Sequence, residues 1–158
     1  PDSHFNMVRP GISLYGISPL GKPHHSLNPV MKMKAPVVLV KKMNAGDSVG
    51  YSRLYTAEKD EKIALLQAGY ADGIPTVFSN SGSVEIKGSQ YPIIGKVSMD
   101  LIAINCGEDT IKEGDEAVFW GGEHENTRLE YLAIKYKKIP YEFLTGVSTR
   151  VARNLINE

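Results

Sequence analysis

Short apolar runs, separated by turn-forming residues, fill most of this 158-residue chain. The clearest runs occupy residues 33–43, 63–68, 83–87, 91–105 and 117–120. The run at 83–87 alternates strictly between polar and apolar side chains, which is typical of a half-exposed strand. The longest run is interrupted at Gly95 and Asp100, which indicates a bend or bulge. Many short strands with frequent turns predict a mainly β domain, either a closed barrel or a sandwich.

One helix is predicted after these runs, over residues 127–138. Thr127 and Glu130 fit a capping box. An apolar stripe at helical spacing follows, formed by Leu129, Leu132, Ala133 and Tyr136. Lysines gather near the predicted end, where positive charge suits the helix dipole, and Pro140 blocks continuation. Residues 141–151 are then predicted to form a strand, a turn and an exit that carries an arginine.

The first part of the chain differs from the rest. Residues 5–16 begin like a short strand and continue through a Pro-Gly break. Residues 17–27 are rich in proline, glycine and histidine, which predicts an exposed connection. His24 and His25 are adjacent rather than spaced for a metal cage, so they are interpreted as surface residues. The β-rich part begins at about residue 30.

Composition and charge exclude several classes of function. The 18 basic and 18 acidic residues cancel, and no basic run suggests nucleic acid or an anionic membrane. Cys106 is the only cysteine, so neither a disulfide framework nor a cysteine-based zinc site is expected, and no metal site is predicted. No apolar run approaches the roughly 20 residues of a membrane helix. The chain begins with neither an initiator methionine nor a signal-peptide pattern, which is compatible with a piece of a longer protein.

The turn at residues 69–75, GYADGIP, is the strongest candidate for a functional loop. Two glycines, an aspartate and a proline stop the preceding strand sharply. Tyr70 lies at the lip of this turn, where a loop can present it to a ligand. From the residues alone, a hairpin corner with a packing tyrosine is the commoner interpretation.

Six segments in order together resemble one family. They lie at residues 5–16, 45–51, 69–73, 92–100, 114–116 and 141–151, and include AGDSVGY, GYADG and PIIGKVSMD. In this order and spacing the chain resembles the C-terminal part of alanine racemase, a pyridoxal-phosphate-dependent amino-acid racemase. The resemblance covers essentially the whole chain. Each motif alone is weak, and the agreement of all six carries the resemblance.

The resemblance implies a fold and a domain division. A TIM barrel that binds pyridoxal phosphate would precede a barrel-like β domain, in a head-to-tail homodimer. Residues 1–29 would be the last barrel strand and its connection, and residues 30–158 the C-terminal β domain. The lysine that carries the cofactor would lie in the missing barrel. The chain alone is therefore expected to be inactive and not to bind the cofactor, and the whole enzyme is expected to be cytoplasmic.

The resemblance also implies the reaction and the residues that act on substrate. The enzyme would interconvert L- and D-alanine for peptidoglycan, so acid/base groups must flank the α-carbon. Tyr51 matches the catalytic tyrosine, which each subunit supplies to its partner. The main-chain N–H of Met99 matches the donor to the substrate carboxylate, and Asp100 shares its loop. Tyr70 matches a residue that lines the substrate corridor, and Thr149 matches a position beside the substrate side chain.

Three residues match positions that bind the cofactor. Arg9 matches the arginine that meets the pyridine nitrogen and keeps it unprotonated, which tempers the ring's capacity to take up electrons. Gly11 and Ile12 match backbone donors to the cofactor phosphate. No nucleic acid and no membrane contact are expected for this segment.

Departures from the family pattern leave the substrate open. Thr76 and Lys96 each stand where relatives often have arginine, and Thr149 replaces a common tyrosine. A small hydroxyl residue at 149 would enlarge the pocket and make it more polar. A serine or broad-specificity racemase is therefore an alternative to alanine, and serine racemases of glycopeptide resistance carry a membrane domain in addition.

Two alternatives lie outside racemisation. A non-catalytic β interaction domain could keep the scaffold, although it would need none of Arg9, Tyr51 and Met99. A pyridoxal-phosphate decarboxylase of ornithine or diaminopimelate also pairs a barrel with a β domain. The motifs at 69–73 and 98–100 argue against that class.

Overall fold

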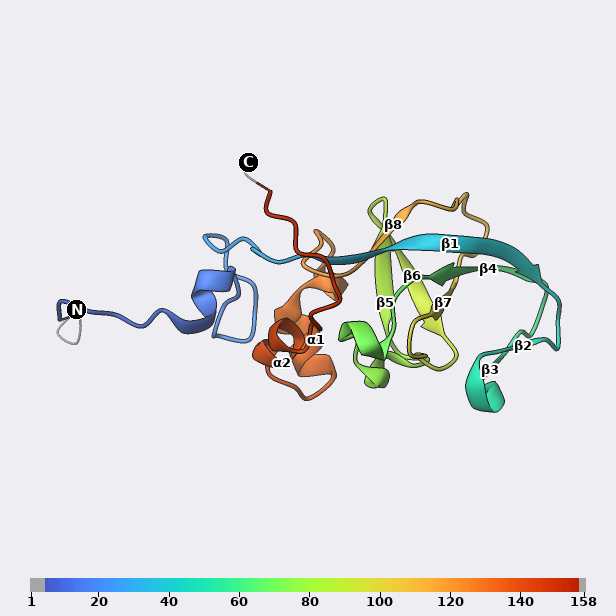
Figure 1. Ribbon diagram of the computed structural model, residues 1–158, viewed down its shortest axis with the longest axis horizontal. Helices are drawn as coiled ribbons and strands as arrows, with labels where there is room; N and C mark the ends of the chain where they lie inside the picture. Colours follow the sequence, from blue (N-terminus) through green and yellow to red (C-terminus); the bar gives the residue numbers. More distant parts are fainter. Residues whose placement is uncertain (1–4, 157–158) are drawn as a thin grey trace.

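Six antiparallel strands close into a barrel (Figure 1). The computed structural model describes residues 5–156. Around the barrel the strands follow the order β1, β4, β7, β6, β5, β8, and β8 pairs again with β1. Their bounds are β1 Met33–Met43, β4 Glu61–Leu66, β5 Ser83–Ile86, β6 Ser89–Ile94, β7 Ile102–Asn105 and β8 Glu116–Trp120. The predicted mainly β, barrel-like fold is confirmed.

The long strand β1 closes the barrel because its two halves pair with different neighbours. Residues 33–36 pair with β8, and residues 37–43 pair with β4. A register shift between Val37 and Leu39 bends the strand between the two sheets. Pro36 lies at this change of partner, where its carbonyl accepts a hydrogen bond from the Gln67 N–H at 3.0 Å. A proline inside a strand is tolerated at such an irregular position.

An excursion between β1 and β4 carries a second, smaller sheet. Strands β2 (Ser48–Val49) and β3 (Tyr55–Thr56) flank a 3₁₀ turn, η2 (Tyr51–Arg53). The excursion lies at the end of the molecule farthest from the N-terminus (Figure 1). A small apolar cluster supports it, formed by Met43, Ala57, Ile63, Ile94 and Ala103.

Helices and short turns cover another side of the barrel. Two short helices are α1 (Leu129–Lys135) and α2 (Pro140–Thr145), and the remaining 3₁₀ turns are η1 (Gly11–Tyr15), η3 (Tyr70–Asp72), η4 (Thr76–Phe78) and η5 (Glu125–Thr127). Trp120 meets Phe143 of α2 edge-on, with ring centroids 5.8 Å apart, and Phe78 lies 6.2 Å from Phe143. These three side chains are almost fully buried and join α2 to the barrel.

Three local predictions are wrong. The strand predicted at the start of 141–151 is helix α2, because Pro140 starts a helix well and Glu142 accepts the Ile139 N–H. The capping box at Thr127 is not formed, because the Thr127 hydroxyl bonds the His124 carbonyl and Glu85. The run at 83–87 is not half-exposed, because Glu85 is buried as well.

Glu85 tolerates burial because its carboxylate has partners. It accepts the His124 N–H at 3.0 Å and the Thr127 hydroxyl at 3.1 Å. A buried charge with such donors costs far less than an unpaired one. Successive side chains of β5 therefore still point to opposite faces of the strand, but those of Val84, Glu85 and Ile86 are all buried.

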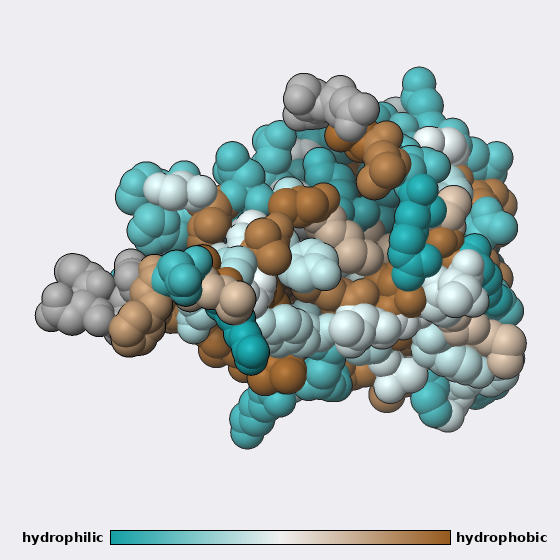
Figure 2. Space-filling model, turned by 60° about the vertical axis from the view of Figure 1, so that its left-hand side comes forward, coloured by the Kyte–Doolittle hydropathy of each residue, from teal (hydrophilic) through white to brown (hydrophobic). Residues whose placement is uncertain are grey.

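The N-terminal part extends away from the barrel (Figure 1). Residues 5–10 are exposed and form no strand with the rest of the described chain. Hydrophobic residues are visible at the surface on this side of the molecule (Figure 2), and Phe5, Met7 and Val8 are each more than 60% exposed. That residues 1–29 end a TIM barrel stays a prediction, because its neighbouring strands are not in this chain. Within residues 5–156, no helix has the length and apolar character needed to cross a membrane.

Candidate active site

The turn after β4 is built around the carboxylate of Asp72. Its Oδ2 accepts the Gly69 N–H at 2.8 Å, which folds residues 69–72 back on themselves. Its Oδ1 accepts the Arg150 Nε at 2.7 Å. The Asp72 carbonyl also accepts the Ser148 N–H at 3.2 Å. One residue therefore ties turn η3 to the C-terminal segment, 76 or more positions further along the chain.

The loop between β6 and β7 lies against the same turn. The Tyr70 N–H donates to the Ser98 carbonyl at 3.0 Å, and the Ala71 N–H donates to the Met99 carbonyl at 3.1 Å. Gly69 makes this approach possible, because a Cβ there would lie 2.2 Å from the Met99 carbonyl oxygen. A glycine is therefore required here for close backbone approach rather than for an unusual φ.

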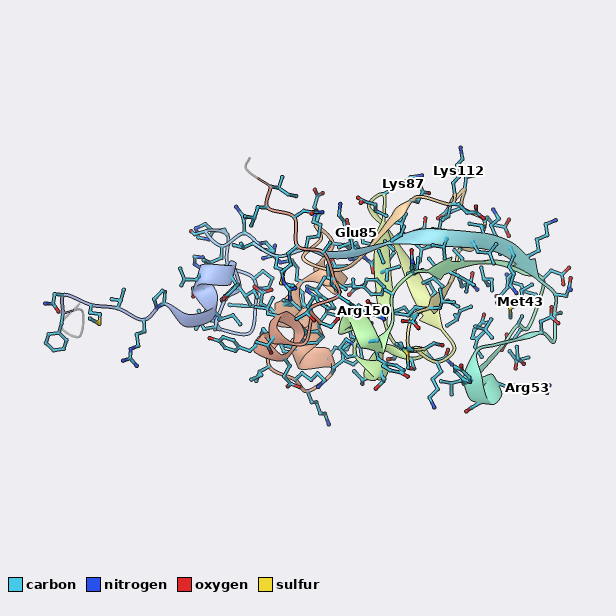
Figure 3. The ribbon with its side chains drawn as sticks, in the orientation of Figure 1. Met43, Arg53, Glu85, Lys87, Lys112 and Arg150 are labelled. Atoms are coloured by element: carbon cyan, nitrogen blue, oxygen red, sulfur yellow. The ribbon has the colours of Figure 1, made fainter. Side chains whose placement is uncertain are left out.

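Arg150 connects the third segment. Its Nη2 donates to Asp100 Oδ1 at 2.6 Å, while its Nε bonds Asp72 (Figure 3). The hydrogen bond to Asp72 first, and then that to Asp100, raises the pKa of the Arg150 guanidinium, which is always charged. Four sequence-predicted substrate residues come together here, and we call them the substrate-residue cluster: Tyr70, Met99, Asp100 and Thr149.

The Met99 main-chain N–H is available as a donor. Within residues 5–156 it makes no hydrogen bond to any backbone or side-chain acceptor. The residue is half-exposed, at 51%. A main-chain N–H usually finds a partner in the protein or in solvent, so a carboxylate could occupy this position. This arrangement suits the expected role of Met99.

Tyr51 lies on η2, in the excursion between β1 and β4, rather than on the three segments of that cluster. Its side chain is 70% exposed. The turn has unusual backbone: Ser52 has a φ of 63° and Arg53 a φ of 48°, both left-handed. Non-glycine residues in this conformation cost free energy and are frequent in functional loops. Arg53 marks this turn at the far end of Figure 3.

Few contacts hold η2 to the barrel. Asn80 donates from Nδ2 to the Leu54 carbonyl at 2.8 Å and accepts the Gly95 N–H at 2.7 Å. A Cβ on Gly50 would lie 3.5 Å from the Lys96 nitrogen. The turn before Tyr51 therefore borders the start of the loop that carries Met99.

The three predicted cofactor-binding residues lie at the opposite end of the molecule. Gly11 and Ile12 start η1, beside α2, where a Cβ on Gly11 would lie 3.2 Å from the Tyr141 hydroxyl. Their main-chain N–H groups bond no acceptor within residues 5–156. Arg9 is exposed just before them. Backbone N–H donors beside a guanidinium fit the acceptors of a phosphorylated pyridine cofactor.

Sequence reasoning missed the central ion-pair network. Arg150 was recognised only as an arginine in an exit segment, and Asp72 only as a turn former. The signal for pairing them was weak, because Asp72 and Arg150 are far apart in the sequence. Charges of opposite sign within the motifs that carry the resemblance would have been the sole hint, and many such charges are simply solvated.

Two open pockets lie elsewhere. One, of about 530 Å³, is lined by Tyr55, Glu58, Glu61 and Asn105 among others, and the second, of about 200 Å³, lies beside Lys42 and Asp60. No sequence-predicted site residue lines either pocket. Apart from Ile12, whose side chain is buried, the predicted residues instead lie on exposed turns and loops.

Comparison with known proteins places these features in a family. The family described as "Alanine racemase, C-terminal domain" matches residues 30–155. An alanine racemase of Vesicomyosocius okutanii is 43% identical over 152 residues, which is 96% of this chain and 43% of that protein. The chain thus spans less than half the length of this curated relative.

Solved structures agree with the sequence comparison. An alanine racemase from Streptomyces coelicolor superimposes with a TM-score of 0.91 at 38% identity, over all of this chain and 43% of that one. An alanine racemase from Bartonella henselae, described with covalently bound pyridoxal phosphate, gives a TM-score of 0.84 at 33% identity. That match covers 92% of this chain and 40% of the other.

Proposed function

This chain belongs to the alanine racemase C-terminal domain family, and on that premise we propose that it is the C-terminal part of a pyridoxal-phosphate-dependent alanine racemase. The whole enzyme would be an isomerase that interconverts L- and D-alanine, the latter for peptidoglycan. Residues 1–29 would complete an upstream TIM barrel. Without that barrel and its lysine, the 158-residue chain is expected to be inactive.

The observation that carries this proposal is the Met99 N–H within the substrate-residue cluster. Backbone bonds from Tyr70 and Ala71 hold the Met99 loop in place, while the Met99 N–H itself has no acceptor in the described residues. A fixed donor of this kind is suited to the carboxylate that all amino acids share. A scaffold without catalytic function would not need it.

The separation of the other candidate residues supports a site shared between subunits. The turn η2, which includes Tyr51, lies at one end of the long axis of the molecule, and η1, which begins at Gly11, lies toward the other (Figure 1). One chain therefore does not bring Tyr51 to its own Arg9 and Gly11. A head-to-tail dimer would solve this, because each Tyr51 would then reach the cofactor-binding end of its partner.

The roles of the residues follow from their chemistry. Pyridoxal phosphate, when bound, supplies a conjugated ring that takes up the negative charge formed at the α-carbon. Arg9 would donate to the ring nitrogen, and the N–H groups of Gly11 and Ile12 would hold the phosphate. The Met99 N–H would orient the substrate carboxylate. The Tyr51 hydroxyl would remove or return the α-proton from one face, with a group outside this chain on the other.

A second candidate substrate is serine. Thr149 is exposed next to Arg150, in the substrate-residue cluster. A threonine there leaves room and a hydroxyl where an aromatic ring would fill the space. A polar substrate side chain could gain a hydrogen bond at this position, which is the observation that favours serine or a broader specificity.

The direct experiment compares racemisation of L-alanine and L-serine by the full-length parent protein loaded with pyridoxal phosphate. Alanine turnover that falls by a factor of about 10² or more in Tyr51→Phe supports the proposal, since general acid/base groups contribute on this scale. Tyr131→Phe, an exposed tyrosine on α1, is the matched control and should keep full activity.

The remaining outcomes also decide between the candidates. Preferential turnover of serine would make Thr149 a specificity residue, and Thr149→Tyr should then shift the preference toward alanine. A parent protein that binds the cofactor but racemises neither amino acid would refute the proposed activity.

A further inference from the structure

One carboxylate lies on the loop that carries the Met99 donor, and a second lies on the adjoining turn η3. Asp72 is largely buried, with its side chain 16% exposed, and Asp100 is adjacent to Met99 in the sequence. When ionised, both side chains can accept hydrogen bonds but cannot donate them. Left alone, they would place two negative charges beside a position proposed to take an anionic carboxylate, and like charges at short range repel.

Arg150 is the one cation that pairs with these two carboxylates in the described part of the chain. It reaches Asp72 from Nε at 2.7 Å and Asp100 from Nη2 at 2.6 Å. It thus uses separate nitrogens of one planar group to hold two carboxylates at fixed positions. A lysine could not hold both in this way, because its ammonium is a single point charge.

The same guanidinium links the three chain segments that form the cluster. Asp72 belongs to η3, Asp100 to the loop between β6 and β7, and Arg150 to the segment after α2. The backbone bonds of Tyr70 and Ala71 join η3 to the loop, but no backbone bond in the described residues joins the loop to the segment of Arg150. The Arg150 side chain makes that connection.

We propose that Arg150 is a positioning residue for substrate binding: it neutralises Asp72 and Asp100 and thereby lets the Met99 N–H donate a hydrogen bond to a substrate carboxylate. This inference rests on the proposed racemase function and adds an electrostatic role to it. The side-chain hydrogen bonds of Arg150 go to Asp72 and Asp100, so it would act through these two carboxylates.

The test uses the full-length parent protein loaded with pyridoxal phosphate, and the variant Arg150→Gln. The KM for L-alanine should rise about tenfold or more, because an unpaired carboxylate then faces the substrate carboxylate. The kcat should change by less than about threefold, because the residue does not touch the reacting atoms. Arg153→Gln is the matched control, since Arg153 donates only to main-chain carbonyls. It should leave both constants unchanged.

Three readouts separate this role from a purely structural one. Raising the salt concentration should lower the KM of Arg150→Gln, because the repulsion is screened. Inhibition by L-alaninamide, which lacks the carboxylate charge, should be the same in the variant and in the wild type. The double variant Arg150→Gln/Asp100→Asn should recover part of the affinity for alanine.

A measurement independent of activity follows the loop itself. Hydrogen exchange at the Tyr70 and Ala71 amides should be faster in Arg150→Gln than in Arg153→Gln, because the loop loses its side-chain tether. Arg150→Lys, which keeps the charge, should give an intermediate KM.

The outcomes distinguish this inference from the proposed function. If the wild type racemises alanine and the KM of Arg150→Gln stays within about twofold, the positioning role is overturned while the function stands. An equal loss for alanine and alaninamide, without salt dependence, also overturns it. A wild-type protein that does not racemise alanine removes the proposed function itself.

Discussion

The turn around Asp72 and the turn around Tyr51 both carry candidate site residues, but the chain holds them differently. The Asp72 turn is fixed by backbone bonds to two other segments and by the Arg150 ion pairs. The Tyr51 turn is exposed and has left-handed backbone at two residues, and Asn80 donates to the Leu54 carbonyl at its end. The difference fits the proposed roles: a donor proposed to bind substrate needs a fixed position, whereas a residue proposed to serve another subunit must project from its own.

Truncation of a side chain that follows each turn in the sequence is expected to give the largest contrast in stability. Phe78→Ala should destabilise the protein by about 3–5 kcal/mol, because Phe78 is fully buried next to Phe143 and Tyr136. Leu54→Ala, in the half-exposed residue after η2, should change the stability by less than about 1 kcal/mol. Urea denaturation monitored by tryptophan fluorescence measures both. Similar losses would mean that the two turns are equally supported.

Adding a methyl group at Gly69 should separate steric from conformational cost. Gly69→Ala is expected to cost about 3 kcal/mol and to displace Met99, because the new Cβ meets main-chain atoms. Gly46→Ala is the comparison: it has open space but a φ of 88°, so only the conformational cost of about 1–2 kcal/mol remains. Thermal denaturation of both variants shows which substitution lowers the stability more. A milder effect at Gly69 would contradict the close backbone contact.

Relieving the backbone of the Tyr51 turn should stabilise the protein. Arg53→Gly is expected to add up to about 1 kcal/mol, since glycine adopts the left-handed conformation without the penalty that other residues incur. Lys41→Gly, at an exposed position of β1, should instead destabilise the protein, because glycine is unfavourable in a strand. A loss of stability in Arg53→Gly would show that the arginine makes contacts that outweigh its backbone conformation.

The smallest expected effect on stability concerns the thiol of Cys106, a residue that lies in neither turn. Burial raises the pKa of its thiol to about 11, so the thiolate is scarce at neutral pH. Folded protein should react slowly with a thiol reagent at pH 8 and rapidly after denaturation. Because the folded pKa exceeds the ordinary value of 9.0, the stability from this group is present below pH 9 and falls as the pH rises toward 11. Fast labelling of the folded protein would contradict its burial.

The barrel strands could be predicted because their signals are local. Alternation and apolar runs located most strands; the hairpin between β5 and β6 turns at Lys87-Gly88, where both residues have positive φ. Helix α2 was missed, because its β-forming residues outweighed the Pro140 start signal in the sequence. The burial of Glu85 was missed because its partners, His124 and Thr127, lie about 40 positions away.

The candidate site was predictable only in part, and through the resemblance rather than the pattern. The motifs named Tyr70, Met99 and Thr149, but nothing local in the sequence places them side by side. Their proximity depends on Gly69 and on Arg150, which contact the loop between β6 and β7 from distant parts of the sequence. Long-range ion pairs of this kind leave no periodic signal.

The central claim is that Tyr51 acts on the site of a partner subunit, and mixed dimers of the full-length parent test it most directly. Tyr51→Phe and Arg9→Ala should each be nearly inactive alone. If the site is shared, a mixed dimer has one site with both residues intact, so reassembling equal amounts should restore about a quarter of the wild-type activity. A mixture as inactive as its components, under conditions where wild-type dimers reassemble with full activity, would contradict the account.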